Sequence, residues 1–82
     1  MAWSRDVFST MIQSVGHNED EESPEMTIVF VKGGTYVYDG VPEDVADQLS
    51  RAPSVGQMFL SDIKGQYPFR KGNYILDSRG SE

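Results

Sequence analysis

The sequence predicts an α+β domain: a three-stranded antiparallel β-meander followed by two short α-helices packed on one face. Three observations predict this fold. β-branched and aromatic residues form short runs with a period near two over residues 8–39. Adjacent glycines, Gly33 and Gly34, separate the last two runs and suit a tight hairpin turn. From residue 41 onward the apolar period is close to four, which is typical of α-helices.

Three runs account for the strands. "VFSTMIQSVG" has a period near two and places the start of the first strand near Phe8. "MTIVFVKGG" gives the strongest signal, with Ile28 and Phe30 on one face and Val29 on the other. Because both faces are apolar, we expect this strand to be central in the sheet. "TYVYD" follows the glycines and returns as the antiparallel partner.

The first helix is predicted within "GVPEDVADQLSRA", where Val41, Val45 and Leu49 fall on one stripe. Pro42 suits the first turn because its missing N–H forfeits no helical hydrogen bond there. Pro53 ends the helix.

A second helix is predicted to begin after Ser54, which has capping-box spacing to Gln57. Phe59, Ile63 and Tyr67 follow at four-residue steps and form its expected buried stripe. The apolar stripes of the two helices must cover one face of the sheet.

The chain has 82 residues, enough for one small domain of modest stability. We expect an N-terminal tail over residues 1–7, a single domain over residues 8–71 and a C-terminal tail over residues 72–82, in which "NYILD" suits a short extra strand or an oligomer contact. Residues 17–25 carry five acids and a Ser-Pro pair, so we expect an exposed acidic loop there.

The composition excludes several classes of site. No cysteine is present, which excludes disulfides and thiolate metal centres. The single histidine, His17, lies near Glu19 and Asp20, but one histidine with loop carboxylates is a poor transition-metal site. We therefore expect no catalytic residue, no metal and no cofactor, and a protein that is not an enzyme. Without a leader or a long apolar run, we expect a cytoplasmic location and no membrane contact.

The charge distribution gives one indication of an anionic ligand. The net charge is −6, from 13 acidic and 7 basic residues, which repels nucleic acid unless the cations gather in one place. Five of the acids lie in the acidic loop, so the rest of the chain carries eight acids against seven bases. Lys64, Arg70 and Lys71 form a small basic island, with no acid between Asp62 and Asp77.

Tyr36 and Tyr38 must point to the same face of their strand. If that face meets the helices, both rings belong to the core; if it is open, the rings can stack on nucleobases. Val37 is the only apolar residue on the opposite face of this strand, so the helices are expected to cover the tyrosines. We therefore expect the rings to be mostly core, with a hydroxyl reaching the rim.

The order of the short motifs resembles the KTSC domain family, a small module found at the C-terminus of some lysyl-tRNA synthetases and alone in bacterial and phage proteins. The resemblance covers residues 9–71. Its residues are Ser14, Gly16, Tyr36, Tyr38, Gly40, Val41, Pro42, Ala52, Ser54, Gly56, Phe59, Ile63, Lys64 and Tyr67. Two features depart from the family pattern: His17 replaces a common aromatic residue, and the loop after it is longer and more acidic. The resemblance implies a small domain for which the synthetase context suggests RNA binding.

The start of the second helix is a second candidate for an anion site. Backbone N–H groups around Ser54 and Gly56 lie at the positive end of the helix dipole, although Ser54 also serves as a simple cap. Arg51 lies one turn earlier. Lys64 is about 15 Å further along the helix axis, so a single compact pocket requires a symmetric homodimer.

Two hypotheses of function follow. The first is a non-catalytic binding module for nucleic acid or a phosphate-bearing nucleotide. The second is a small, phage-encoded protein-binding factor or inhibitor that engages a host protein through the acidic loop and exposed apolar residues such as Trp3 or Tyr74. The candidate ligand-binding residues are Tyr36, Tyr38, Arg51, Ser54, Gly56, Lys64, Tyr67, Phe69, Arg70 and Lys71.

Overall fold

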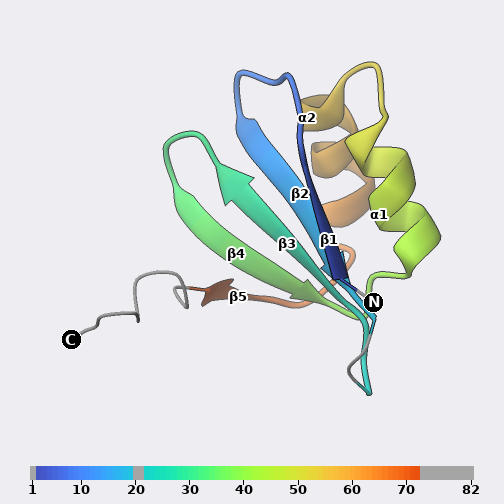
Figure 1. Ribbon diagram of the computed structural model, residues 1–82. Helices are drawn as coiled ribbons and strands as arrows, with labels where there is room; N and C mark the ends of the chain where they lie inside the picture. Colours follow the sequence, from blue (N-terminus) through green and yellow to red (C-terminus); the bar gives the residue numbers. More distant parts are fainter. Residues whose placement is uncertain (1, 20–21, 73–82) are drawn as a thin grey trace.

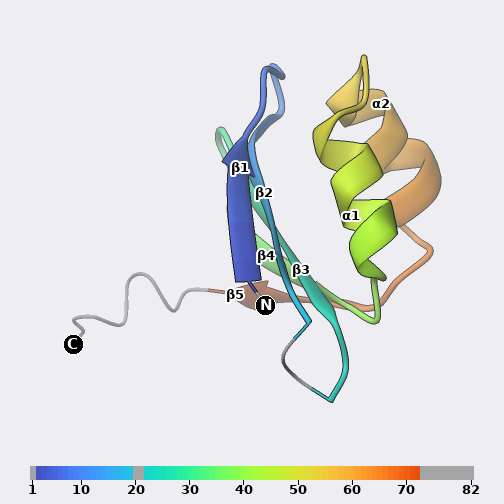
Figure 2. The ribbon, with the colours of Figure 1, turned by 45° about the vertical axis from the view of Figure 1, so that its right-hand side comes forward.

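The computed structural model describes residues 2–19 and 22–72. Five antiparallel strands form one sheet in the order β1-β2-β3-β4-β5, so every strand pairs with its neighbour in sequence (Figure 1). The helices lie on one face of this sheet, and no helix covers the other (Figure 2). The elements are β1 (Ala2–Asp6), β2 (Ile12–Asn18), β3 (Glu25–Phe30), β4 (Gly34–Asp39), α1 (Glu43–Ser50), α2 (Val55–Met58), the π-helix η1 (Phe59–Ile63) and β5 (Phe69–Gly72).

The predicted three-stranded meander is wrong, because an additional strand pairs at each edge of the sheet. β1 lies within residues 1–7, where the sequence predicted a tail, and β5 follows the second helix. Phe8 does not begin a strand: it is fully exposed in the β1–β2 loop, and β2 begins at Ile12. The extra strand predicted in "NYILD" lies outside the described residues.

The predicted acidic loop is also too long at its start. β2 continues through Asn18, and β3 begins at Glu25, so the connection between them is shorter than residues 17–25. His17 is therefore a strand residue, and it is buried. Its side chain faces the helices because it pairs with Met26, a core residue of β3.

The strand register defines the face that the helices cover. Directly paired residues on neighbouring strands share a face. One row across this face consists of Trp3, His17, Met26, Tyr38 and Phe69, and the next consists of Arg5, Val15, Ile28, Tyr36 and Lys71. The helices add Ala46, Leu49, Val55, Phe59 and Ile63 to the core against these rows.

The second helix changes form after one turn. Ser54 caps it as predicted, because its hydroxyl accepts a hydrogen bond from the Gln57 N–H (3.4 Å). The chain then widens into η1, where the Lys64 N–H donates to the Phe59 carbonyl (2.9 Å). Tyr67 lies beyond the helix, where it is half-buried against the core. No helix in the described ranges is long and apolar enough to span a membrane.

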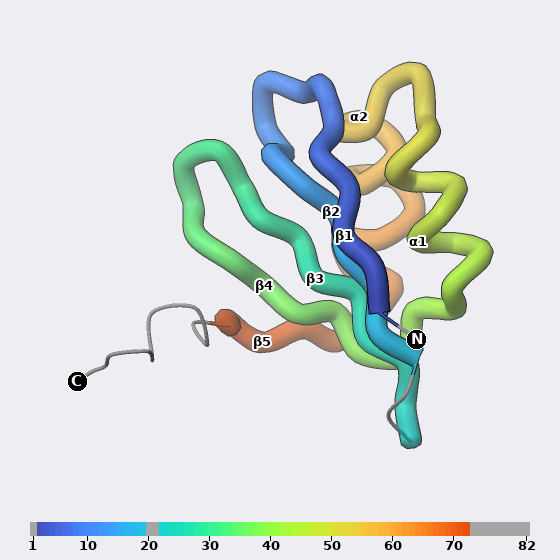
Figure 3. Tube along the Cα trace, in the orientation of Figure 1, coloured from blue at the N-terminus to red at the C-terminus, as the bar shows by residue number. Residues whose placement is uncertain are grey.

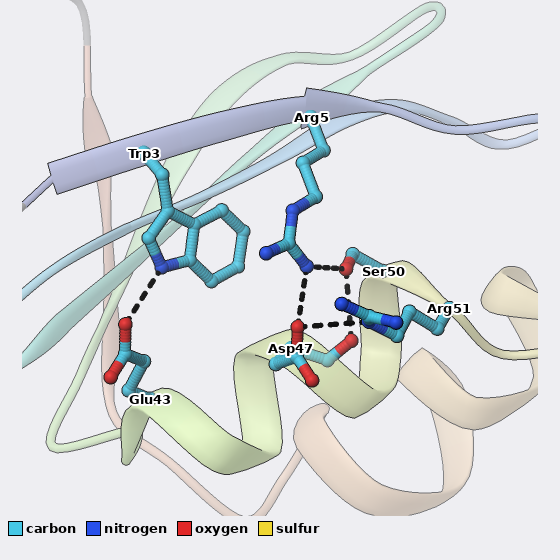
Figure 4. Close-up of polar contacts among 6 residues, drawn as sticks. All are labelled: Trp3, Arg5, Glu43, Asp47, Ser50 and Arg51. Atoms are coloured by element: carbon cyan, nitrogen blue, oxygen red, sulfur yellow. Dashed lines mark hydrogen bonds and ion pairs between the residues drawn. The ribbon is translucent and has the colours of Figure 1, made fainter.

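Side-chain contacts with α1 hold the edge strand β1 in place (Figure 4). The Trp3 indole N–H donates to Glu43 Oε2 (3.0 Å). The Arg5 guanidinium lies over the Trp3 ring, 4.2 Å from its centre, and donates to Asp47 Oδ1 (2.5 Å). Arg51 donates to the same carboxylate oxygen at 3.0 Å. β1 is thus tied to a helix some forty residues away in sequence.

These contacts make stability depend on pH in a defined direction. The hydrogen bonds from Arg5 and Arg51 hold the pKa of Asp47 below its usual range. The stability that they contribute is present above the unfolded-state pKa of about 3.9 and is lost as pH falls through the folded-state pKa. We expect Asp47→Asn to unfold at a slightly lower temperature than the parent near pH 7, and this gap to close on acidification below about pH 4.

Thermal unfolding followed by circular dichroism across pH checks this expectation. Asp62→Asn is the matched control, since Asp62 makes no ion pair with another described residue. A gap for Asp47→Asn that persists unchanged at low pH would show that lost packing, not lost charge, causes it.

Candidate functional site

An aromatic cleft lies between η1 and the strands β3, β4 and β5. Its volume is about 330 Å³, which is at the small end of ligand pockets. It is apolar apart from two phenols and one lysine, and no carboxylate lines it. The lining residues are Met11, Phe30, Gly33, Tyr36, Tyr38, Phe59, Leu60, Lys64 and Phe69.

The aromatic rings of the cleft support one another. The Tyr38 ring lies 5.5 Å from the rings of Phe59 and Phe69, centre to centre. Tyr36 lies 5.7 Å from Phe69 and 5.6 Å from Phe30. These spacings suit edge-to-face and tilted ring pairs, which hold the rings in fixed orientations. Phe69 remains 58% exposed, so part of its side chain is accessible to a ligand.

The prediction that the helices cover the tyrosines is confirmed. Tyr38 is only 4% exposed, and Tyr36 is half-buried against the same core. Burial raises the pKa of the Tyr38 phenol, and the nearby Tyr36 adds to this effect. The Tyr38 phenol therefore remains a neutral hydrogen-bond donor at physiological pH.

The three arginines of the described chain are neutralised by carboxylates. Arg5 and Arg51 both pair with Asp47, at 2.5 and 3.0 Å. Arg70 pairs with Asp39 at 2.6 Å and with Glu25 at 2.9 Å. Their positive charge is therefore committed to contacts within the domain.

The lysines have a different environment. Lys32, Lys64 and Lys71 form no ion pair with any residue in the described ranges. Lys64 lines the cleft, and Lys71 shares a face and a register position with Tyr36. Lys32 lies in the β3–β4 hairpin, next to Gly33, which also lines the cleft. Among the described residues, Lys64 and Lys71 thus place unpaired positive charge in the aromatic cleft and beside it.

The structure divides the predicted basic island. Arg70 and Lys71 are adjacent in β5, so their side chains point to opposite faces of the sheet. Arg70 pairs with Val37 on the open face, whereas Lys71 lies on the cleft face. The open face carries a hollow of about 470 Å³, and its only lining cation is Arg70, which is already paired.

Other predicted site residues lie away from the cleft. Arg51 is at the end of α1, and Tyr67 packs against the core. Ser54 and Gly56 line a separate groove beside Phe8. Of the predicted site, the cleft therefore collects the two tyrosines, Lys64 and Phe69, with Lys71 beside them.

Five lining residues were not singled out from the sequence as part of a site. Phe30 and Phe59 were assigned only to a strand face and to a buried helical stripe. Gly33 was assigned only to the hairpin turn, and Met11 lies in the loop before β2. Leu60 is a large apolar residue outside the buried helical stripe, and it is 51% exposed. An apolar residue on the outer side of an amphipathic helix is the sequence signal that could have identified it.

The residues assigned to the alternative hypotheses have other roles. His17 Nε2 lies 2.7 Å from the Val41 carbonyl oxygen, so this nitrogen carries the proton and donates. The described residues contain no group of three or more side chains that could hold a metal ion. Trp3 is half-buried, with its ring stacked on His17 at 6.0 Å, and Tyr74 lies outside the described residues.

The fold and the cleft define a small α+β domain with one covered sheet face and an aromatic site at its edge. The sequence profile of the KTSC domain matches residues 8–67, and the chain belongs to this family. The crystal structure of a KTSC domain protein from Yersinia pestis is similar, with a TM-score of 0.77 and 36% identity, over 89% of this chain and all of that one.

Two lysine–tRNA ligases contain similar segments. The ligase of Nostoc punctiforme is 38% identical over 52 residues, which is 63% of this chain and 9% of the ligase. The ligase of a second Nostoc strain is 41% identical over 46 residues, which is 56% of this chain and 8% of the ligase. The chain thus matches a small part of each ligase.

Proposed function

We propose that this KTSC domain is a non-catalytic binding module whose ligand is nucleic acid or a phosphate-bearing nucleotide. The observation that carries the proposal is the position of Lys64 in the aromatic cleft and of Lys71 beside it, neither of which pairs with a carboxylate of the described residues. A nucleobase stacks on aromatic rings whatever its sequence, and a phosphate binds cations that are not already neutralised.

Three site residues have complementary roles in this proposal. The exposed ring of Phe69 stacks on the base, with Tyr36 beside it. Lys64, at the end of η1, binds the phosphate as a point charge on a flexible stem. The lining contains no nucleophile with an adjacent general base, which supports a binding role over a catalytic one.

The similarity to segments of two lysine–tRNA ligases supports the same ligand class, because those proteins are named for an RNA. The net charge of −6 opposes a long phosphate backbone. We therefore propose a ligand with few phosphates, whose affinity depends more on the rings than on charge.

Charge reversal at Lys64 tests this proposal. Lys64→Glu is expected to weaken binding of adenosine 5′-monophosphate or a short oligoadenylate by roughly 10- to 100-fold at low salt, the loss of one charge-assisted contact. Isothermal titration calorimetry measures the change. Arg51→Glu is the matched control, because it alters the net charge equally, and Arg51, which directly follows α1, does not line the cleft.

The two variants separate the explanations. An equal loss in both variants would indicate general electrostatic repulsion and not a site. Unchanged affinity in Lys64→Glu would remove Lys64 from the site, and parent protein that binds neither probe at low salt would overturn the proposed function.

A further inference from the structure

The large apolar side chains exposed in the described residues are Phe8, Val31, Leu60 and Phe69. Three of them, Phe8, Leu60 and Phe69, line two hollows that share lining residues. Leu60 and Phe69 line the aromatic cleft, while Leu60 and Phe8 line a second groove of about 340 Å³. Met11 lines both, and its carbonyl accepts a hydrogen bond from the Val31 N–H at 3.0 Å.

This second groove is lined by the β1–β2 loop and the start of α2. The backbones of these two segments lie side by side in Figure 3. The groove has no charged residue in its lining. Phe8 is fully exposed there, so its ring has no packing role within the described domain. Its other lining residues are Ser9, Thr10, Met11, Pro53, Ser54, Val55, Gly56, Gln57 and Leu60.

We infer that the ligand is a single-stranded oligonucleotide of at least two nucleotides, with one base in the aromatic cleft and the next stacked on Phe8. This inference rests on the proposed function and names the ligand's class. The two sites share Met11 and Leu60, so a ligand can pass from one to the other without crossing charged side chains. A duplex does not fit this arrangement, because its bases are stacked on each other and are not free to contact aromatic side chains.

The positions of the cations indicate where along its path the ligand's phosphates are bound and how many contacts they make. Lys64 and Lys71 lie at the cleft end, and no cation lines the Phe8 groove. β2 ends and β3 begins at the opposite end of the sheet from the β1–β2 loop (Figure 1). Two phosphate contacts predict a slope of about −1.4 for the logarithm of affinity against the logarithm of salt concentration, at roughly −0.7 per contact.

The experiment compares two probes, adenosine 5′-monophosphate and a single-stranded oligoadenylate of about four nucleotides, by calorimetry at low salt. Phe8→Ala is expected to weaken binding of the oligoadenylate by about 5- to 150-fold, the value of one stacked base, and to leave the monophosphate unchanged. Phe69→Ala is expected to weaken binding of both probes. Val31→Ala is the matched control, since this exposed residue lines neither site, and should change neither.

The outcomes distinguish this inference from the proposed function. If the monophosphate binds but Phe8→Ala leaves oligoadenylate affinity unchanged, the extended path is wrong and the proposed function stands. If the parent protein binds neither probe, both fail. Equal affinity for a duplex overturns the single-stranded assignment. A dimer in native mass spectrometry that Phe8→Ala dissociates, with oligoadenylate affinity unchanged, assigns the groove to a second copy of the chain and overturns the inference.

Discussion

Phe59→Ala is expected to lower the free energy of unfolding by about 3–5 kcal/mol, the usual cost of removing a buried aromatic side chain. Phe59 is 3% exposed, and its ring meets Phe30 and Tyr38 edge-to-face at 5.4 and 5.5 Å. Together with Ile63, which is also buried, Phe59 packs η1 on the sheet. A domain of this size has a total stability of roughly 4–12 kcal/mol, so the variant loses a large share of it.

Urea denaturation at 25 °C measures this loss, and thermal unfolding should show a midpoint lower by on the order of 20 °C. Leu60→Ala is the control, because this neighbouring residue is 51% exposed. Its effect on stability should stay within about 0.5 kcal/mol. A cost below about 1 kcal/mol for Phe59→Ala would mean that η1 is not packed on the sheet as described.

Local patterns were sufficient to predict the centre of the fold. β3 and β4 follow from the alternation at Ile28, Phe30 and Tyr36. The predicted two-residue turn at Gly33 and Gly34 is wrong: Phe30 pairs with Gly34, which is the first residue of β4 and has a positive φ of 83°, so the loop comprises residues 31–33. The helices follow from their four-residue stripes and from the Ser54 cap. In these segments the same residues determine local structure and core packing, so a pattern read along the chain is enough.

The edge strands could not be predicted in this way. Ala2–Asp6 contains one large apolar residue, Trp3, and β5 contains one, Phe69. A strand this short has too few apolar positions to show a period. β1 is held instead by pairing with β2 and by contacts of Trp3 and Arg5 with α1, which are distant in sequence. Such contacts leave no local signal.

The candidate site was likewise predictable only where local sequence patterns determine it. Alternation along β4 was enough to predict that Tyr36 and Tyr38 share the covered face. The basic island was inferred because Arg70 and Lys71 are adjacent in sequence. Once β5 is known to be a strand, adjacent side chains point to opposite faces, so these two residues are separated. The carboxylates of Asp39 and Glu25 that neutralise Arg70 lie 31 and 45 residues away. Which cations remain available for a ligand is therefore a property of the folded sheet.

His17→Phe is expected to lower the free energy of unfolding by about 1–3 kcal/mol, although it keeps an aromatic ring that can stack on Trp3. The His17 Nε2–H donates to the Val41 carbonyl at 2.7 Å, and both residues are buried. A phenyl ring cannot donate, so the buried Val41 carbonyl is left without a hydrogen-bond partner and without water. An unsatisfied buried acceptor costs its full desolvation free energy. Val41 lies just before α1, so the bond also fixes where this helix leaves the sheet.

His17→Gln separates the hydrogen bond from the ring. Glutamine loses the stack on Trp3 but carries an amide N–H that can reach the Val41 carbonyl. If the hydrogen bond dominates, urea denaturation should rank the parent above the glutamine variant and the glutamine variant above the phenylalanine variant. If packing of the ring dominates, the phenylalanine variant should be the more stable of the two, and the role assigned to the buried donor would be wrong. The order of the two variants decides between these explanations, because each keeps only one of the two contacts that His17 makes.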